Sequence, residues 1–357
     1  MEMREYGHGG DIYSPLEQDK RVLDFSVNLN PFGLPPRAAA ALQEAADACV
    51  AYPDPYCREL CRAIADYEGV SADWVLCGNG AADLIYRLVY GLRPKKALVL
   101  APTFSEYEEA VRLSGGRVLS FLLREARDFA PDEGLPRVIR EERPELVFLC
   151  NPNNPTGKLM EKELLLDTAT ACAEVGAVLA VDECFLDFTA REPELTMKAA
   201  LPQYPRLVVL KAFTKFFAMA GLRLGYLLTA DETLRDLVWN AGQPWSVSGP
   251  AQRCGIAALG DSGYIARTRR ELPLLRESLY EALTALPLTV YRGEANYLLV
   301  RSGDTALAEK LLERGILIRS CRNYHGLDER YYRFAVKTAV DHARLIAALR
   351  ECLGEGK

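Results

Sequence analysis

The sequence predicts an α/β fold built on a seven-stranded, mostly parallel sheet, followed by a smaller α+β domain. From about residue 45 to residue 260, short apolar runs alternate with helical patterns, as in a sheet whose strands are joined by helices. Most of these runs are continuously apolar, which is typical of strands covered by helices on both faces. After residue 262 the pattern changes to mixed, shorter segments. These observations indicate one large and one small domain.

The candidate strands of the large sheet are seven runs, at 74–77, 97–101, 117–121, 146–150, 177–181, 207–211 and 224–228. Several of the intervening segments have helical periodicity. In ADLIYRLVYG, for example, Leu84, Ile85, Leu88 and Val89 fall on one face of a helix. We therefore expect helices to connect the strands and to cover the sheet.

The chain divides into three predicted parts. Residues 1–40 form an N-terminal arm that is rich in Gly, Pro and Asn, and we expect it to pack against the small domain near the cleft. Residues 41–262 form the large domain. Residues 263–357 form the small domain, in this order: a long helix at about 263–286, the strands TVYRG and NYLLVR, a helix at 305–314, the strands ILIRS and YYRFAV, and a last helix from about 340.

Composition excludes several classes of protein. The formal charge of −6 has no basic run behind it, so neither nucleic acid nor an anionic membrane is an expected partner. No apolar stretch approaches the roughly 20 residues of a membrane span, and the N-terminus lacks the apolar segment of a signal peptide, so we expect a cytoplasmic protein. The ten cysteines are scattered and mostly lie in apolar patterns, which is typical of buried thiols in a reducing compartment.

A metal site is not expected. Cys57 and Cys61 are one helical turn apart but have no matching second pair. The chain has only three histidines, His8, His325 and His342.

The central chemical signal is the segment AFTKFFAMAGLRLGY, residues 212–226. Lys215 follows a buried strand and therefore lies at the edge of the sheet where ligands bind in α/β proteins. A lysine can form an imine with an aldehyde cofactor, and Arg223 can bind that cofactor's phosphate, with the hydroxyl of Thr214 as a further donor. The alternative interpretation is a surface lysine and arginine in a loop.

Three more segments place polar groups after predicted strands. In NPNNPTG the side chain of Asn154 can donate to a phenolic oxygen, and in AVLAVDECF the carboxylate of Asp182 can meet a protonated pyridine nitrogen. In CGNGAADLI the amides of Gly80, Ala81 and Ala82 can form an anion site at the start of a helix. The alternatives are ordinary turns, a carboxylate that caps a turn, and a helix start that binds nothing.

Together these segments resemble the fold-type-I pyridoxal-phosphate family of aspartate-aminotransferase-like enzymes, over essentially the whole chain. The resemblance implies that Lys215 forms the imine with pyridoxal 5'-phosphate, that Asp182 contacts its pyridine nitrogen and that Asn154 contacts its ring hydroxyl. It also implies that Thr214, Arg223 and the amides of residues 80–82 hold the phosphate.

Two further positions follow from the resemblance. Phe104, in PTFSEY, matches the aromatic residue that stacks on the cofactor ring. Tyr52, in AYPDP, matches a tyrosine that reaches the phosphate from a neighbouring subunit, which implies a homodimer.

The chain also departs from the family pattern. Many relatives have Ser or Thr three residues before the lysine, where this chain has Ala212, and a tyrosine three residues after the aspartate, where it has Phe185. The first departure removes a phosphate donor. The second bears on the branch of the family.

Two branches of the family act on phosphorylated substrates, the histidinol-phosphate aminotransferases and the threonine-phosphate decarboxylases of cobalamin biosynthesis. The segments YGHGGDIY, LDFSVNLNPFGLP, PWSVSGPAQ and LIRSCRNYHGLDERYYRFAV resemble the decarboxylases more closely, and Phe185 fits them too. The match implies substrate contacts from six residues: His8, Gly9, Asn28, Asn154, Arg319 and Arg333. The alternatives are arginines in surface salt bridges and a mobile N-terminal histidine.

The expected reaction is decarboxylation of L-threonine O-3-phosphate to (R)-1-amino-2-propanol O-phosphate. A small phosphorylated amino acid carries a carboxylate and a phosphate, and the planar guanidinium groups of Arg319 and Arg333 suit both anions. Transamination of histidinol phosphate, decarboxylation of L-serine O-phosphate and a catalytically silent cofactor-binding protein are the alternatives that the sequence leaves open.

Overall fold

The computed structural model describes residues 7–16 and 21–354, and it confirms the predicted fold class. The large sheet has seven strands in the order β2-β8-β7-β6-β5-β3-β4. Strand β8 is antiparallel to both of its neighbours, and the other pairs are parallel. The strands are β2 (Val75–Gly78), β3 (Lys96–Ala101), β4 (Arg117–Leu122), β5 (Leu146–Cys150), β6 (Val178–Asp182), β7 (Leu207–Ala212) and β8 (Gly225–Leu228).

These strands coincide with the seven predicted runs to within one residue at each end. The central strands β5, β6 and β7 are buried along their whole length, which explains why their sequences are continuously apolar.

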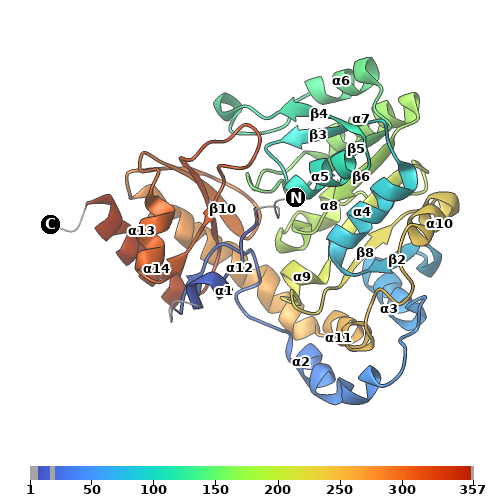
Figure 1. Ribbon diagram of the computed structural model, residues 1–357, viewed down its shortest axis with the longest axis horizontal. Coiled ribbons are helices and arrows are strands. Elements are labelled where there is room, and N and C mark those ends of the chain that lie inside the picture. Colours follow the sequence, from blue (N-terminus) through green and yellow to red (C-terminus); the bar gives the residue numbers. More distant parts are fainter. Residues whose placement is uncertain (1–6, 17–20, 355–357) are drawn as a thin grey trace.

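Helices cover both faces of the large sheet (Figure 1). On one face α4 (Gly80–Leu92), α5 (Ser105–Leu113) and α10 (Glu232–Asn240) share a core with the strands. On the other face the core takes in α3 (Arg58–Glu68), α6 (Gly134–Glu142), α7 (Lys162–Val175) and α11 (Gly249–Leu259). The shorter elements are α2 (Pro36–Gln43), α8 (Glu192–Leu195), α9 (Phe213–Phe216) and the 3₁₀ turns η1 (Glu44–Cys49), η2 (Ala72–Trp74), η3 (Glu125–Arg127), η4 (Leu186–Phe188) and η5 (Lys198–Ala200).

A second, four-stranded antiparallel sheet lies beside the first, with the order β12-β13-β10-β9. The long helix α12 (Ser262–Thr284) leads from the large sheet to this part of the chain (Figure 1). The other elements here are β9 (Leu288–Tyr291), β10 (Tyr297–Ser302), α13 (Leu307–Glu313), β11 (Ile316–Leu317), β12 (Arg319–Ser320), β13 (Tyr331–Ala335) and α14 (Ala339–Leu353).

The structure corrects one expected strand. The run ILIRS, residues 316–320, is not continuous but divides at Ile318 into β11 and β12. Strand β11 pairs in parallel with β1 (Leu23–Asp24), whereas β12 pairs with β13. The chain therefore changes sheets in the middle of one apolar run.

The N-terminal segment is held against the small sheet. Besides the β1–β11 pair, the amide of Ala335 donates to the carbonyl of Phe25, and the side chain of Asn296 donates to the carbonyl of Asn28 at 3.0 Å. A one-turn helix, α1 (Tyr13–Leu16), precedes β1. The domain boundaries at residues 40 and 262 stay predictions.

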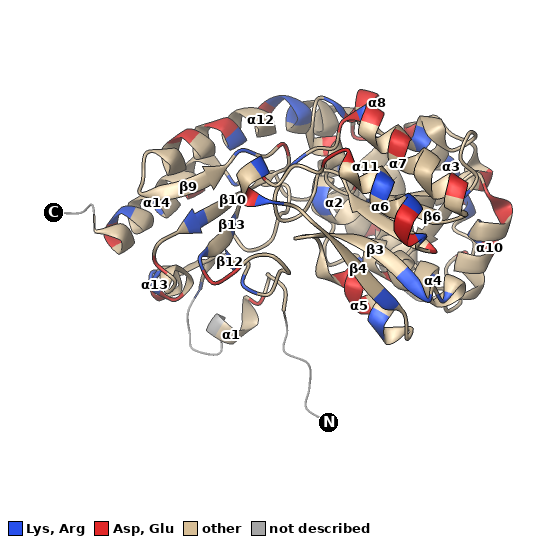
Figure 2. Cartoon of the chain, turned by 90° about the horizontal axis from the view of Figure 1, so that it is seen from above, with Lys and Arg blue, Asp and Glu red and all other residues tan. Residues whose placement is uncertain are grey.

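Charged side chains of both signs are interspersed along outer helices such as α12 and α5 (Figure 2). Among the helices of residues 7–16 and 21–354, none is both long enough and apolar enough to cross a membrane. In the same ranges, no cluster of His, Cys, Asp and Glu is arranged to hold a metal ion.

His342 makes stability depend on pH. Its side chain is 6% exposed in α14, and its Nε2 accepts a hydrogen bond from the amide of Lys337 at 2.8 Å. Burial lowers the pKa of His342 to about 4 from an ordinary value of 6.5. Below pH 6.5 the unfolded chain therefore binds a proton that the folded chain does not, so acid favours unfolding.

We expect this residue alone to remove about 2 kcal/mol from the free energy of unfolding between pH 7 and pH 5. Urea unfolding of the wild type and of His342→Gln at both pH values measures this contribution. The carboxylates titrate alike in the two proteins, so the difference between them isolates the effect of His342. The variant should lose less stability on acidification. An equal loss in both would mean that His342 is protonated in the folded state.

Candidate active site

An inner cavity of about 200 Å³ lies where the strands β5, β6 and β7 end, facing the small sheet. The carboxyl ends of strands are the usual ligand site in α/β sheets. Thirteen of the predicted site residues line it: His8, Gly9, Asn28, Ala81, Ala82, Phe104, Asn154, Asp182, Thr214, Lys215, Arg223 and both arginines of the small sheet, Arg319 and Arg333. Segments from the whole length of the chain thus meet at one point.

Lys215 lies in α9, the single helical turn after β7, and faces this cavity. Burial lowers the pKa of Lys215 to about 8, with the positive charges of Arg333 and Arg223 acting in the same direction. Its Nζ is 5.7 Å from the ring centroid of Phe185. A lysine with such a pKa is about half uncharged at pH 8, and the uncharged amine is the form that attacks an aldehyde.

Asp182, the last residue of β6, is held by donors to both of its oxygens. The hydroxyl of Tyr107 donates to Oδ2 at 2.6 Å, and the amide of Cys184 donates to Oδ1 at 2.9 Å. Burial, followed by the charge of Asp182, raises the pKa of Tyr107 well above its ordinary value, so the phenol keeps its proton. The ring of Tyr107 stacks on Phe148 with centroids 4.8 Å apart. The carboxylate therefore has a fixed orientation.

Sequence reasoning missed Tyr107. The signal that was available is its spacing, three residues after Phe104 in PTFSEY, because residues i and i+3 share a face of a helix. The rings of Phe104 and Tyr107 meet edge to face at 5.6 Å.

Donor groups gather around the start of α4. This helix has no side-chain hydrogen bond from its N-cap residue, so the amides that follow are available to an anion. Gly80 has a φ of +82°, and a Cβ there would lie 2.7 Å from Nη2 of Arg223. A glycine is therefore needed for the guanidinium to approach. Ala81 and Ala82 line the cavity, whereas Gly80, the third residue that was predicted to hold the phosphate through its amide, is not among the lining residues.

Arg333 and Asn154 are in direct contact. The buried guanidinium of Arg333, on β13, donates from Nη1 to Oδ1 of Asn154 and from Nη2 to the carbonyl of Ser26 at 2.8 Å. Within residues 7–16 and 21–354, Nε of Arg333 and Oδ1 of Asn28 have no hydrogen-bond partner although both are buried. Unsatisfied buried polar groups beside a cavity point to a ligand that satisfies them.

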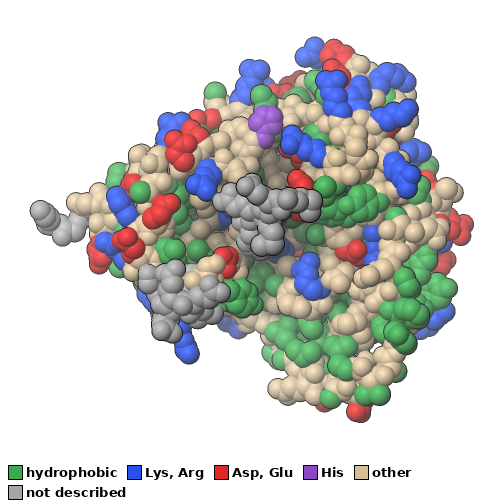
Figure 3. All heavy atoms as spheres, in the orientation of Figure 1, with side chains coloured by type: hydrophobic (Ala, Val, Ile, Leu, Met, Phe, Trp, Pro, Cys, Tyr) green, Lys and Arg blue, Asp and Glu red, His purple; other side chains and the backbone are tan. Residues whose placement is uncertain are grey.

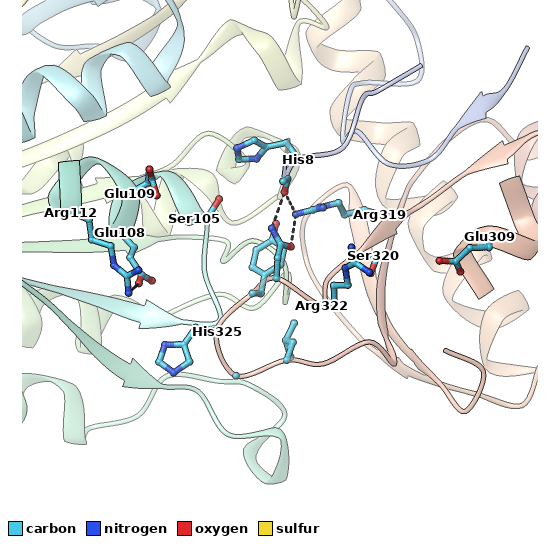
Figure 4. A pocket seen from close by; sticks show the side chains of 15 residues that line it. His8, Ser105, Glu108, Glu109, Arg112, Glu309, Arg319, Ser320, Arg322 and His325 are labelled. Atoms are coloured by element: carbon cyan, nitrogen blue, oxygen red, sulfur yellow. Dashed lines mark hydrogen bonds and ion pairs between the residues drawn. The ribbon is translucent and has the colours of Figure 1, made fainter. Parts of the chain in front are cut away.

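His8 and Arg319 stand at the border with an outer cavity of about 950 Å³ (Figure 4). His8 Nε2 is 2.7 Å from Oε1 of Glu106. Arg319 donates to the carbonyl of Gly7 and, at 2.8 Å, to Oδ1 of Asn323. Tyr324, a further residue that sequence reasoning missed, lines both cavities beneath the guanidinium of Arg319.

Gly9 has a steric role in this arrangement. A Cβ at that position would lie 2.4 Å from the carbonyl oxygen of Ser26, so only glycine lets the N-terminal segment approach so closely.

Tyr52 is not part of the cavity of its own chain. It is 80% exposed and stacks on Trp245 with ring centroids 4.5 Å apart. Its assignment to a neighbouring subunit's site stays a prediction. Ala212 and Phe185, the two departures from the family pattern, both line the cavity.

These residues fit pyridoxal phosphate. Donors to a phosphate line the cavity, together with Asp182 at the end of β6 and the ring of Phe104. The unsatisfied polar atoms of Asn28 and Arg333 leave donors and acceptors for a substrate. Thr214, Arg223 and the amides of Ala81 and Ala82 would hold the phosphate, and Lys215 would bind the aldehyde carbon.

Comparison with known proteins agrees with this interpretation. The aminotransferase class I and II family matches residues 20–350. The threonine-phosphate decarboxylase of Salmonella typhimurium is 39% identical over 360 residues, covering 99% of this chain and 98% of that protein. The histidinol-phosphate aminotransferase of Desulfitobacterium hafniense is 36% identical over 335 residues, covering 92% of this chain and 91% of the relative.

A solved structure shows the same similarity in three dimensions. The histidinol-phosphate aminotransferase from Clostridium acetobutylicum has a TM-score of 0.87 to this chain at 30% identity, covering 94% of this chain and all of that one (100%).

The pKa of Lys215 predicts how the apoprotein binds pyridoxal phosphate. Because only the free amine reacts, the rate at which the near-visible absorption band appears should rise about tenfold per pH unit below pH 8 and level off above it. Stopped-flow absorbance between pH 6 and pH 9 measures this rate. Lys215→Ala should give no such band, whereas Lys95→Ala, which changes an exposed lysine, should behave as the wild type. A normal band in Lys215→Ala would identify another lysine as the anchor.

The hydrogen bond from Tyr107 predicts a second effect. Tyr107→Phe removes one donor to a charged group, a loss of about 1.5–3 kcal/mol, and should reduce kcat roughly tenfold or more while the cofactor stays bound. Asp182→Asn should reduce kcat further. Steady-state kinetics measure kcat, and cofactor dissociation constants measure whether the cofactor stays bound. Tyr90→Phe, on the outside of α4, is the control. Unchanged kcat in Tyr107→Phe would show that the amide of Cys184 orients Asp182 alone.

Proposed function

Because the chain belongs to the aminotransferase class I and II family of pyridoxal-phosphate enzymes, we propose that it decarboxylates L-threonine O-3-phosphate. The product would be (R)-1-amino-2-propanol O-phosphate, and the place of the reaction would be cobalamin biosynthesis in the cytoplasm. The observation that carries the proposal is the pair of arginines, Arg319 and Arg333, at one cavity with His8.

The two arginines are matched to a substrate with two anionic groups. In the antiparallel pair of β12 and β13, Arg319 and Arg333 are direct cross-strand partners, so their side chains leave the same face of the sheet. Two cations placed side by side repel each other unless anions lie between them. A carboxylate and a phosphate on one small molecule supply those anions, and guanidinium groups bind both in a bidentate manner.

Residues of the chain itself would hold and deliver the protons that the reaction needs. Bound pyridoxal phosphate supplies an electron sink for the bond that breaks at the substrate's α-carbon. Asp182, oriented by Tyr107, holds a proton at the ring nitrogen of that group. Lys215 Nζ faces the same cavity with a pKa of about 8, so it can deliver the proton that the α-carbon takes up once carbon dioxide has left.

The arginines also determine which bond breaks. Of the bonds at the α-carbon, the one held perpendicular to the cofactor ring is the one whose electrons the ring accepts. Decarboxylation therefore requires the carboxylate, and not the hydrogen, to be held in that direction. Arg319 and Arg333 are the groups in the described residues that are placed to anchor it.

Transamination of histidinol phosphate is the second candidate. It is favoured by the 36% identity to a histidinol-phosphate aminotransferase and by the likeness to a solved structure of another. Serine phosphate is a further possible substrate of the decarboxylase, because one methyl group changes the binding free energy by only about 1–3 kcal/mol.

A homodimer completes the proposal. Large apolar side chains are exposed in and near the large domain's first helices and before α11, among them Leu42 in α2, Val50 and Tyr52 after η1, and Trp245 before α11. Figure 3 shows hydrophobic side chains gathered in the part of the surface where Figure 1 labels α2 and α11. Exposed apolar groups that gather in one area are typical of protein interfaces. A second copy of the chain seated there would bring its Tyr52 toward the neighbouring phosphate site.

A single turnover distinguishes the two reactions. With L-threonine O-3-phosphate and no keto acid, we expect stoichiometric carbon dioxide and a cofactor that stays in its pyridoxal form. Arg319→Ala and Arg333→Ala should each lower kcat/KM by at least about 30-fold, or 2 kcal/mol, because a substrate charge is left unpaired.

Absorbance spectra and trapped carbon dioxide measure the outcome, with L-serine O-phosphate tested in parallel. Arg314→Ala is the matched control, since Arg314 lies in the same part of the chain but pairs with Glu351 at the surface. Conversion to the pyridoxamine form without gas would contradict the proposal and favour histidinol phosphate as the substrate.

A further inference from the structure

Three cysteines outside the active site form a cluster between α3 and β2. Sγ of Cys61 lies 3.7 Å from Sγ of Cys77, and the thiol of Cys57 also contacts Cys77. All three side chains are buried, with at most 8% exposed. Cys77 is in β2, opposite Tyr226 of β8, and Cys61 is in the first turn of α3. Two thiols in van der Waals contact need to approach by only about 1.6 Å to reach the roughly 2.05 Å of a disulfide.

The two thiols of this pair differ in access and in chemistry. Cys61 lines a surface cavity of about 490 Å³, whereas Cys77 does not. The hydrogen bond from Cys77 lowers the pKa of Cys61, and Arg235 acts in the same direction. Hydrogen bonds with Cys57 and Cys61, together with burial, raise the pKa of Cys77 well above its ordinary value. Cys61 is thus the thiol that can react first with a molecule in the surface cavity, and Cys77 is the buried thiol that can react with Cys61 afterwards.

The cavity beside Cys61 suits an anionic small molecule. Arg58, Arg62 and Arg235 line it, against the carboxylates of Asp73 and Asp236. Arg58 pairs with Asp54 and Arg235 pairs with Glu232 and Asp236, whereas Arg62 makes no ion pair within the described residues. Arg62 is therefore the guanidinium that can bind a carboxylate of a disulfide such as glutathione disulfide beside the reactive thiol.

We propose that Cys61 and Cys77 are a reversible redox site that a small anionic disulfide oxidises. The Cys61 thiolate attacks one sulfur of glutathione disulfide, forming a mixed disulfide and releasing one glutathione. Cys77 then loses its proton and attacks Cys61, which forms the Cys61–Cys77 bond and releases the second glutathione. The two protein thiols lose two electrons and two protons, and the oxidant's disulfide gains them.

The position of Cys77 couples this site to the cofactor. The residues after Cys77 form the turn that leads to the amides of Ala81 and Ala82. This turn has no free space, because a Cβ on Gly78 would lie 2.7 Å from Cγ of Leu84. A shift of β2 toward α3 therefore displaces the amides, and we expect the oxidised protein to bind pyridoxal phosphate several-fold more weakly. This coupling rests on the proposed cofactor site, whereas the disulfide does not.

Trypsin and mass spectrometry of the full chain test the disulfide. The cofactor-bound, reduced protein is treated with glutathione disulfide, alkylated and digested without reductant. Cleavage after Arg58, Arg62 and Arg87 places Cys61 in the peptide 59–62, Cys77 in 63–87 and Cys57 in 38–58. We expect 59–62 linked to 63–87, two of the ten thiols lost, and full recovery of both with dithiothreitol.

Variants and cofactor binding complete the test. Cys57→Ser should leave the linked peptide unchanged, and Cys61→Ser should abolish it. No linked peptide in the wild type, a link between 59–62 and 38–58, or glutathione that stays on Cys61 would each overturn the redox site, whether or not the enzyme is a decarboxylase. A linked peptide with unchanged cofactor affinity would overturn the coupling alone.

Discussion

The buried guanidinium of Arg333 joins three segments that are far apart in the sequence. From β13 it reaches Asn154, in the loop after β5, and the carbonyl of Ser26, in the N-terminal segment. Its charge also helps to hold the pKa of Lys215 near 8. Desolvating a guanidinium is costly, and these hydrogen bonds offset part of that cost. The cavity, the orientation of the small sheet and the state of the lysine therefore all depend on this one side chain.

A buried ion-pair network lies close to Lys215 in the sequence. Lys211, on β7 four residues before Lys215, is fully buried, and its Nζ lies 3.1 Å from Asp187 and from Glu68. Although burial opposes its charge, these carboxylates raise the pKa of Lys211 well above its ordinary value. The network joins β7, η4 and α3, so the strand that precedes Lys215 is tied to the turn that follows Asp182. Rigid placement of reacting groups is what orients a substrate.

The cavity is lined by chemically different groups, and that difference supports the proposed chemistry. Ala81, Ala82, Thr214 and Arg223 offer donors to a phosphate, and Asp182 offers a carboxylate of fixed orientation. The small sheet contributes Arg319 and Arg333 to the same cavity. One group of residues can thus hold a cofactor while another holds a doubly anionic substrate. The redox pair of Cys61 and Cys77 belongs to neither group of residues. Cys77 nevertheless lies next to the turn that leads to Ala81 and Ala82, which are proposed to hold the cofactor's phosphate.

The sequence by itself determined the seven strands, their mostly parallel arrangement and the residues that follow them, because burial on both faces leaves continuous apolar runs and because ligand groups gather at strand ends. Lys215, Asp182 and Asn154 could be placed for that reason. The tertiary structure alone decided that ILIRS serves two sheets, that Tyr107 orients Asp182, that Arg333 meets Asn154, and that Cys61 lies against Cys77. Each of these is a contact between segments distant in sequence. Local periodicity records which face of an element is buried, but it carries no information about which distant side chain fills the space opposite.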